Sequence, residues 1–395
     1  MRVTTANAYN TRIENLGQRQ SEMLEANERM TSGKRVARAS DDPTNAARAE
    51  RAIAVVQRSD ANQRALEASR NAMQLAESSL GDAGELLQQV RETMVAAGNG
   101  SYSDGERSAL ASKLVELRKQ LLAVANRSDG AGGFLFGGQG ATQQPFIDAA
   151  GGVQFRGSPG GLNVASDEKL PLTLDGNAPW LKAATGNGVF ETRATSSTAW
   201  IDAGHVTAPA QLTGGNYAVQ FSSGAGGTTY SVTRDGNPTS LTNVAYESGK
   251  RIEIDGMGFS ISGNPAPGDS FSAVPSQKTL SVFDTIDQAI TDLKASGRTP
   301  SQAMQTTQRT LRDLDASANS LQQLRTLVGE SLKRADSFED RVAGHKLYGK
   351  TEESNATDLD MVQAISDFQN QQAGYDAALK SYASVQRMSL FQYIS

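Results

Sequence analysis

Cysteine is absent from this sequence of 395 residues, and histidine occurs only twice. Without cysteine the chain can form no disulfide, thiolate metal site or iron–sulfur cluster, and it has no thiol nucleophile. The two histidines, His205 and His345, are far apart in the sequence and have no partner at the spacing of a known motif. A metal site built on several histidines is therefore not expected.

A block of positive charge and a long apolar run are also missing. Lysine and arginine number 38 and aspartate and glutamate 43, which gives a net charge of −5. Phosphate contacts need clustered basic side chains, so we expect no nucleic acid and no membrane among the partners. No run reaches the ~20 apolar residues of a membrane span, and the N-terminus lacks the apolar core of a cleaved signal peptide. These signals alone indicate a cytoplasmic protein, unless export uses an uncleaved N-terminal signal.

Glycine and proline, which break helices, are scarce outside the middle of the chain. Between Gly130 and Pro275 lie 26 of the 38 glycines, 9 of the 11 prolines and both tryptophans. The flanks are rich in Ala, Gln, Leu, Arg and Glu, which favour helix. The sequence therefore predicts an α+β fold, in which a β-rich segment is inserted between two helical arms.

Heptad spacing predicts coiled-coil packing in the arms. The clearest seam consists of Leu66, Met73, Leu80, Leu87 and Met94, interleaved with Ala76, Ala83, Val90 and Ala97. A second helix should begin at the capping box Ser103–Glu106. Another should begin at Thr299–Pro300, because proline suits the first helical position. Its apolar face is interrupted by Arg325 and Glu339, which indicates a partly hydrated seam.

Both ends of the chain carry a thin apolar stripe at helical spacing. The stripe residues are Ile13, Leu16, Met23 and Met30 near the start, and Met361, Ile365, Phe368, Tyr375, Leu379, Tyr382 and Val385 near the end. Isolated helices are marginal in water because their nucleation is costly. We therefore expect these helices to order well only against each other or against copies in an assembly. With Leu390 and Phe391 of the tail, but without Ile365, the stripe residues form the predicted assembly interface.

Short alternating segments in the middle predict strands. Residues 216–221 and 228–233 are alternating and β-branched, and the glycine-rich stretch 222–227 between them is interpreted as a flexible loop. Residues 251–254 and 259–261 flank Asp255–Gly256, which is the pattern of a hairpin. The apolar triplet Phe134–Phe136, between two glycine pairs, predicts a short strand after a tight turn.

Three features resemble reactive sites, and each has a simpler structural explanation. The pair Asp41–Asp42 has no further ligand nearby, whereas a helix N-cap at Asp42 followed by Pro43 accounts for it. Gly33–Arg35 lacks the rest of a phosphate-binding loop, so we interpret Gly33 as a helix C-cap. The glycines at 132–138 lack the nucleotide-binding pattern, and no nucleophile–base or metal motif occurs elsewhere. We therefore predict no enzymatic activity, no catalytic residue, no cofactor and no metal.

The segment 30–43, MTSGKRVARASDDP, resembles the turn after the first helix in the flagellin superfamily, and it is most similar to the hook-associated protein 3 branch. Segments 125–146, 261–271 and 381–393 support that branch. The motif residues are Ser32, Gly33, Lys34, Arg35, Ser40, Asp41, Asp42, Pro43, Gly133, Phe134, Leu135, Phe136 and Gly137. The resemblance covers both arms, about 1–147 and 276–395, and only the character of the middle. Gly133–Phe134 departs from the Arg–Tyr or similar pair of many members.

The resemblance implies an elongated, flagellin-like fold with three domains. These would be a terminal coiled coil from 1–42 with 355–395, a helical bundle from 43–147 with 276–354, and a β-rich outer domain from 148–275. It implies a structural protein that joins the hook to the filament of the bacterial flagellum. Its implied partners are hook-associated protein 1, flagellin, an export chaperone and copies of itself in a helical ring. Export would use the flagellar type III system without signal cleavage and place the protein outside the cell.

Two other interpretations stay open. The chain could be a flagellin filament subunit, although the Phe134–Phe136 block and the Ser389–Phe391 tail argue against it. It could instead be a secreted protein whose β insertion, with Trp180 and Trp200, binds a ligand or carries an active site. No catalytic motif occurs in that insertion, and burial of the tryptophans in a core explains them more simply.

Overall fold

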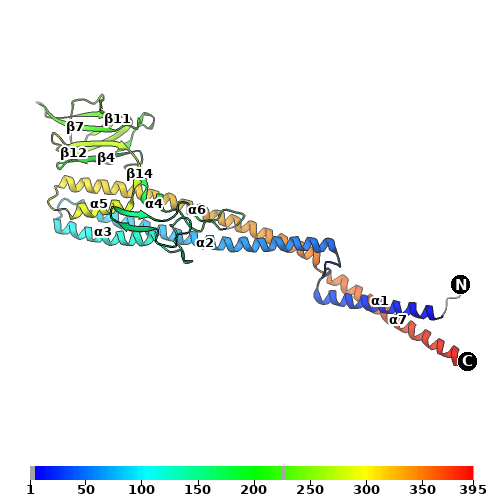
Figure 1. Cartoon of the computed structure of the whole chain (residues 1–395). Helices are drawn as coiled ribbons and strands as arrows, with labels where there is room; N and C mark the ends of the chain where they lie inside the picture. The colour runs from blue at the N-terminus through cyan, green and yellow to red at the C-terminus, as the bar shows by residue number, and fades with distance from the viewer. Residues whose placement is uncertain (1–4, 165, 225–226, 395) are drawn as a thin grey trace. The chain divides into compact units, whose positions relative to one another are not determined.

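The computed structural model describes residues 5–164, 166–224 and 227–394 (Figure 1). The chain divides into two compact units. The described parts of 1–64 and 338–395 form the first, which we call the terminal unit. Residues 65–337 form the second, the central unit. The fold is α+β, as the sequence predicts, whereas the three-domain division stays a prediction.

Four helices form the bundle of the central unit. They are the parts within 65–337 of α2 (Pro43–Ala97) and α6 (Pro300–Thr357), together with α3 (Asp104–Ala125) and α5 (Val282–Lys294). The heptad prediction is confirmed, because all nine seam residues from Leu66 to Ala97 are at most 4% exposed. Arg325 interrupts the apolar face of α6, as the sequence predicts, and its Nη2 lies 2.7 Å from Oε1 of Glu77 in α2.

Both predicted helix starts are confirmed by their hydrogen bonds. Oγ of Ser103 accepts the N–H of Glu106 at 3.3 Å, while Oε2 of Glu106 accepts the N–H of Ser103 at 2.8 Å. Thr299 makes the equivalent pair with Gln302 in front of α6. Such reciprocal caps satisfy backbone donors that a helix start leaves unpaired.

The β-rich part of the central unit has a core of its own. One antiparallel sheet has the strand order β10-β8-β7-β13-β4 with β9 on β8, and another has β11-β12-β5 with β6 on β12. The strands are β4 (Phe190–Thr195), β5 (Ala199–Ile201), β6 (His205–Val206), β7 (Tyr217–Gly224), β8 (Gly227–Arg234), β9 (Asn237–Pro238), β10 (Val244–Ala245), β11 (Arg251–Ile254), β12 (Met257–Gly263) and β13 (Ser270–Pro275). Side chains from both sheets, among them Tyr217, Phe259 and Phe271, bury one another in a single cluster. This is the packing of a β-sandwich.

Three predictions about this region have mixed outcomes. The hairpin at Asp255–Gly256 is confirmed, and both residues have positive φ, as its tight turn requires. The strands at 216–221 and 228–233 are confirmed, but the loop prediction for 222–227 is partly wrong. Strand β7 extends to Gly224 and pairs there with Gly227 of β8.

The strand predicted at Phe134–Phe136 is wrong. Phe134 makes an isolated bridge with Ser128, and Leu135 and Phe136 lie in a turn. The backbone of this turn bonds to distant segments, since the N–H of Leu174 donates to the oxygen of Leu135 at 2.7 Å. Leu135 and Phe136 are nevertheless fully buried. An apolar triplet between glycines therefore marks a buried turn here.

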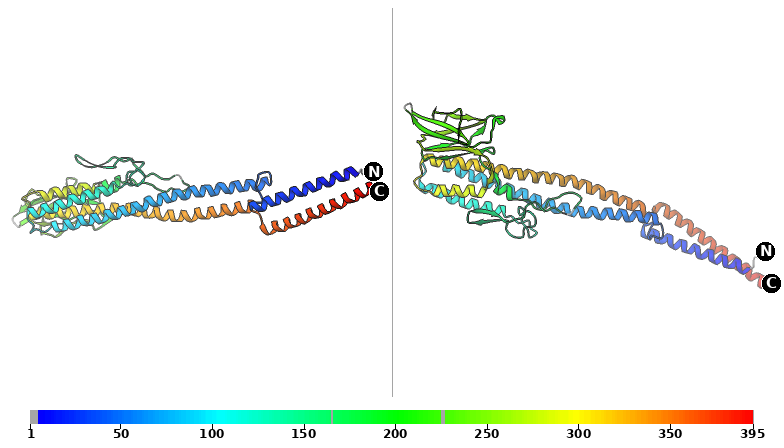
Figure 2. Two further views of the ribbon diagram at one scale, coloured as in Figure 1. Left: turned by 90° about the horizontal axis from the view of Figure 1, so that it is seen from below. Right: turned by 45° about the horizontal axis from the view of Figure 1, so that its top comes forward.

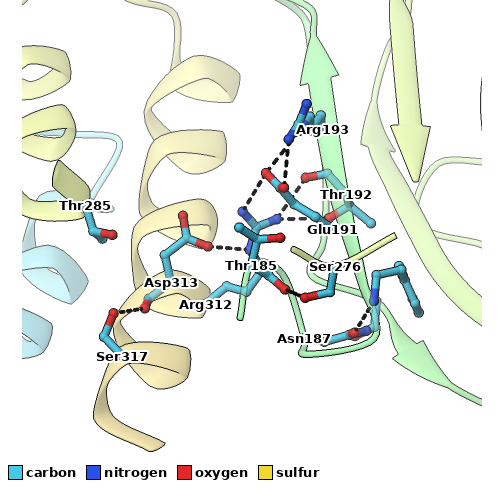
Figure 3. Close-up of polar contacts among 12 residues, drawn as sticks. Thr185, Asn187, Glu191, Thr192, Arg193, Ser276, Thr285, Arg312, Asp313 and Ser317 are labelled. Atoms are coloured by element: carbon cyan, nitrogen blue, oxygen red, sulfur yellow. Dashed lines mark hydrogen bonds and ion pairs between the residues drawn. The ribbon is translucent and has the colours of Figure 1, made fainter. Parts of the chain in front are cut away.

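Smaller elements connect the bundle to the sheets. The hairpin β1 (Phe146–Ala149) and β2 (Gly152–Phe155) and the short helix α4 (Asn177–Leu181) cover the bundle core, where Trp180 is fully buried. Strands β3 (Ala183–Ala184) and β14 (Lys278–Leu280) pair with each other, and the 3₁₀ helix η1 (Pro209–Gln211) precedes β7. Figure 3 shows the polar joint that follows, where Arg312 of α6 meets Glu191 and Thr192 of β4.

The terminal unit contains α1 (Thr5–Ser32) and α7 (Met361–Ile394), together with 43–64 of α2 and 338–357 of α6. Helices α1 and α7 lie side by side and run antiparallel (Figure 2). Within the described residues, no helix is long and apolar enough to cross a membrane.

Candidate assembly surface

The turn between α1 and α2 is bonded to the turn between α6 and α7. The N–H of Arg35 donates to the oxygen of Thr357 at 2.7 Å, and the N–H of Leu359 donates to the oxygen of Gly33 at 2.9 Å. The Arg35 guanidinium also donates to the oxygen of Ala356 at 3.0 Å. Gly33 has φ of 69°, which confirms it as the residue that ends α1. We call residues 33–42 with 356–360 the elbow.

Two aspartates stabilise the backbone conformation of the elbow segment 33–42. Oδ2 of Asp41 accepts the N–H groups of Ala37 and Arg38, and these backbone donors hold the pKa of Asp41 below its usual value. Oδ1 of Asp42 accepts the N–H groups of Thr44 and Asn45, which confirms the predicted N-cap of α2. The Asn45 backbone donor is the main cause of a lowered pKa of Asp42. Both carboxylates therefore act as ionised acceptors for the backbone.

Helices α1 and α7 bury none of their described side chains completely. Over 10–32 and 361–384, each residue is either half-buried or exposed. Their contact is close in places: a Cβ at Gly374 of α7 would lie 2.7 Å from Nη1 of Arg19 in α1. Two helices pressed together can bury only one stripe each, so their outer faces remain open.

The structure sorts the predicted interface residues into two groups. Half-buried positions are held by Leu16, Met23, Met30, Phe368, Tyr375 and Tyr382. Exposed positions are held by Ile13, Met361 and Leu379. The side chains of Val385, Leu390 and Phe391 lie outside the described residues. The role of these residues in assembly stays a prediction.

The stripe interpretation missed two large apolar side chains, Leu24 and Val362, and it left the stripe residue Ile365 out of the predicted interface. Leu24, Val362 and Ile365 are exposed, and Val362 is 82% exposed. Val362 and Ile365 adjoin Met361, so these three form an apolar patch at the start of α7. Leu24 directly follows the stripe residue Met23, and Val362 directly follows Met361. These adjacent apolar residues could have indicated a second apolar face. Contiguous exposed apolar residues of this kind mark interaction surfaces.

The other predicted residues lie elsewhere. Gly133, Phe134, Leu135, Phe136 and Gly137 belong to the central unit, where Phe136 packs edge-on against Trp180 at 5.8 Å between ring centroids. Trp200 is half-buried, and both histidines are exposed. In the described part of the chain, no three His, Asp or Glu side chains are grouped so that they could hold a metal ion.

The chain is similar to flagellar proteins over its whole length. Residues 3–141 match the bacterial flagellin N-terminal helical region, and residues 189–275 match the D2-like domain of flagellar hook-associated protein 1. Flagellar hook-associated protein 3 of Salmonella typhimurium is 26% identical, with 99% of each chain covered. The FlgL structure from Xanthomonas campestris is 30% identical with a TM-score of 0.68, covering 78% of this chain and 99% of that one. The flagellar junction protein FlgL from Legionella pneumophila is 26% identical with a TM-score of 0.65, covering 70% and 95%.

Proposed function

The chain belongs to the flagellar hook-associated protein 3 (FlgL) family of structural junction proteins, and we propose that it connects hook-associated protein 1 to the first flagellin subunits. Two resemblances support these partners. The N-terminal part matches the helical region of flagellin, and the β-rich part matches a domain of hook-associated protein 1. A chain that shares a helical region with flagellin offers it a similar packing surface.

The observation that carries the proposal is the open outer face of α1 and α7. Each described side chain of these helices stays partly exposed, and Met361, Val362 and Ile365 form an apolar patch. Removing apolar surface from water contributes about 25 cal/mol per Å². Copies of the chain, arranged as a ring, would cover this face together with the neighbouring axial proteins.

Export through the flagellar type III system without signal cleavage fits the same features. The absence of cysteine leaves no covalent cross-link that would hinder passage of an unfolded chain. Weakly packed terminal helices cost little to unfold, because little apolar surface is buried in them. A chaperone that covers the patch at Met361–Ile365 would protect it from aggregation before export. The protein would then act outside the cell, without catalysis or a cofactor.

Immunogold electron microscopy of intact flagella, with an antibody against residues 189–275, tests the junction role. One labelled band between hook and filament is expected. Label along the whole filament would identify a flagellin instead. Flagella without any label would contradict the axial role and return attention to the β-rich part as a ligand-binding or enzymatic module.

Removal of residues 361–395 tests the contribution of the terminal helices. The truncated protein should remain soluble, because the central unit keeps both of its cores. Cells that carry only this variant should secrete flagellin without attaching it to the hook. Normal swimming by these cells would contradict the proposal.

A further inference from the structure

A groove of about 500 Å³ lies in the terminal unit, between residues 48–55 of α2 and 348–352 of α6. The two helices are close together here, because a Cβ at Gly349 would lie 2.8 Å from Cγ2 of Val56. Ala52, Val55 and Tyr348 give the groove an apolar surface, and Tyr348 is 63% exposed. The groove is therefore an open apolar surface on the side of the helix pair.

Two arginines give this groove a positive charge. Arg48 and Arg51 line it from α2, and Glu352 of α6 is the one acidic side chain among its lining residues. Nε of Arg51 donates to the oxygen of Ala47 at 3.1 Å, and within the described residues neither arginine forms an ion pair with a carboxylate. The groove thus combines apolar surface with a net positive charge, which suits an apolar segment that has acidic neighbours.

The start of α7 has this complementary character. Its apolar patch, Met361, Val362 and Ile365, is exposed. Residues 351–379, which surround the patch, include six aspartates and glutamates and no lysine or arginine. Asp360 directly precedes the patch, and Asp367 follows it by two positions. An apolar patch in an acidic segment therefore matches an apolar groove lined by arginines.

The groove and the patch stay open in the single chain. Val362 is 82% exposed and Tyr348 63%, so neither surface covers the other. If the patch of one copy enters the groove of the next, each chain uses both surfaces and contacts two neighbours. A contact of this head-to-tail kind generates a ring or a helical assembly.

We propose that the groove receives the apolar patch at the start of α7 from a second copy of this chain, with Arg48 and Arg51 facing the acidic residues around that patch. This inference rests on the proposed junction role, in which copies form a ring, and it assigns a contact between them. A stable protein pair uses ~20–30 residues a side. The groove and the patch involve fewer, so the contact forms in the assembled flagellum, where further contacts hold the copies in place.

Cross-linking in intact flagella tests this contact, and the natural chain has no cysteine that would interfere. The double variant Val55→Cys, Val362→Cys places one thiol in the groove and one in the patch. Flagella are treated with a short bismaleimide, and the products are detected with the antibody against residues 189–275. The double variant should give a series of multimers beyond the dimer, because each copy is linked to two neighbours. Each single variant should remain monomeric.

The matched control is the double variant Gln57→Cys, Val362→Cys. Gln57 is exposed on α2 two positions after Val55, and it therefore lies on the other side of the helix. This control should give no multimers. Glu352→Cys with Ile365→Cys replaces the first pair if that variant is not assembled into flagella.

The charges are tested by adding Arg48→Glu and Arg51→Glu to the cysteine pair. Like charges then face each other, and the cross-linked fraction should fall about tenfold. An unchanged fraction would overturn the proposal, as would equal multimers from the control pair. The absence of multimers from both groove pairs, in flagella that carry the labelled band at the hook, would also overturn it and leave the junction role untouched. Missing label on wild-type flagella would instead contradict the junction role.

Discussion

Arg312 in α6 donates a hydrogen bond from Nη1 to the backbone oxygen of Thr192 in β4, over 2.8 Å. The same guanidinium contacts Oδ1 of Asp313 at 2.8 Å through Nε and approaches Glu191 at 3.7 Å. Its side chain is only 5% exposed. A buried arginine thus joins the helical core to the β core, and it satisfies a strand carbonyl that lies 120 positions away in sequence.

Replacing Arg312 by methionine should weaken this joint strongly. The variant keeps the apolar stem but leaves the buried carboxylate of Asp313 and the Thr192 oxygen without their donor. Breaking a buried pair in this way costs about 3 kcal/mol. Urea unfolding should show the loss, and hydrogen exchange should be faster in β4.

Arg193→Met is the matched control for that experiment. Arg193 also pairs with Glu191, at 2.9 Å, but its side chain is 62% exposed. Exposed pairs contribute about 1 kcal/mol or less. Equal losses in the two variants would show that burial of Arg312 has no special part in the joint.

The elements that the sequence predicted correctly depend on local patterns. The seam from Leu66 to Met94 follows from seven-residue spacing, and the N-cap at Asp42 follows from a side chain three positions before the amide it binds. The joint at Arg312 depends on a residue 120 positions away, and no local pattern could indicate it. The same holds for Phe134–Phe136, where bonds to Leu174 and Gly176 replace the expected strand.

The assembly surface was predicted only along one stripe. Heptad spacing identifies the side chains that two helices turn toward each other, such as Met23 and Phe368. It does not identify apolar side chains that stay exposed outside that contact, such as Val362 and Leu24.

Substitution of Asp42 should reveal how much the N-cap contributes to the elbow. Asp42→Ala removes the acceptor for Thr44 and Asn45, and we expect a loss of about 1 kcal/mol in the local stability of α2. Asp42→Asn keeps an oxygen at the same place and should retain most of it. Hydrogen exchange of the first turn of α2 is the measurement. Equal protection in both variants would contradict the capping role.

Acid should loosen the elbow before it unfolds the bundle. The pKa values of Asp41 and Asp42 lie below the ordinary value of 3.8 in the folded chain, because backbone N–H groups donate to the ionised carboxylates. Carboxyls of this kind stabilise the fold above the unfolded pKa, and the contribution is lost as pH falls from 3.8 through the lower folded value. Protease cleavage within 33–42 should therefore rise below about pH 3.8. The measurement needs a protease that is active in acid. The double variant Asp41→Asn, Asp42→Asn should be cleaved to the same extent at pH 5 and at pH 3.

The apolar patch on α7 should matter for assembly and not for folding. Replacing Met361, Val362 and Ile365 by glutamine should leave the unfolding temperature within about 2 °C, because exposed side chains contribute little to the monomer. Motility and labelling at the hook should be lost. Val95→Gln is the control, since Val95 is an exposed valine of the central unit. Normal motility of the triple variant would remove the patch from the assembly surface.

Gly349 and Gly344, both in α6, should respond to alanine in opposite directions. A Cβ at Gly349 would lie 2.8 Å from Cγ2 of Val56 and 3.2 Å from the oxygen of Ala52, so α2 approaches α6 too closely for any side chain. A Cβ at Gly344 would meet nothing within 4 Å. Gly344→Ala should stabilise the terminal unit by up to about 1 kcal/mol through helix propensity, whereas Gly349→Ala should destabilise it by about 1–2 kcal/mol through overpacking. Hydrogen exchange over 338–357 measures both, and a gain in protection for Gly349→Ala would show that α2 and α6 do not pack this closely in solution.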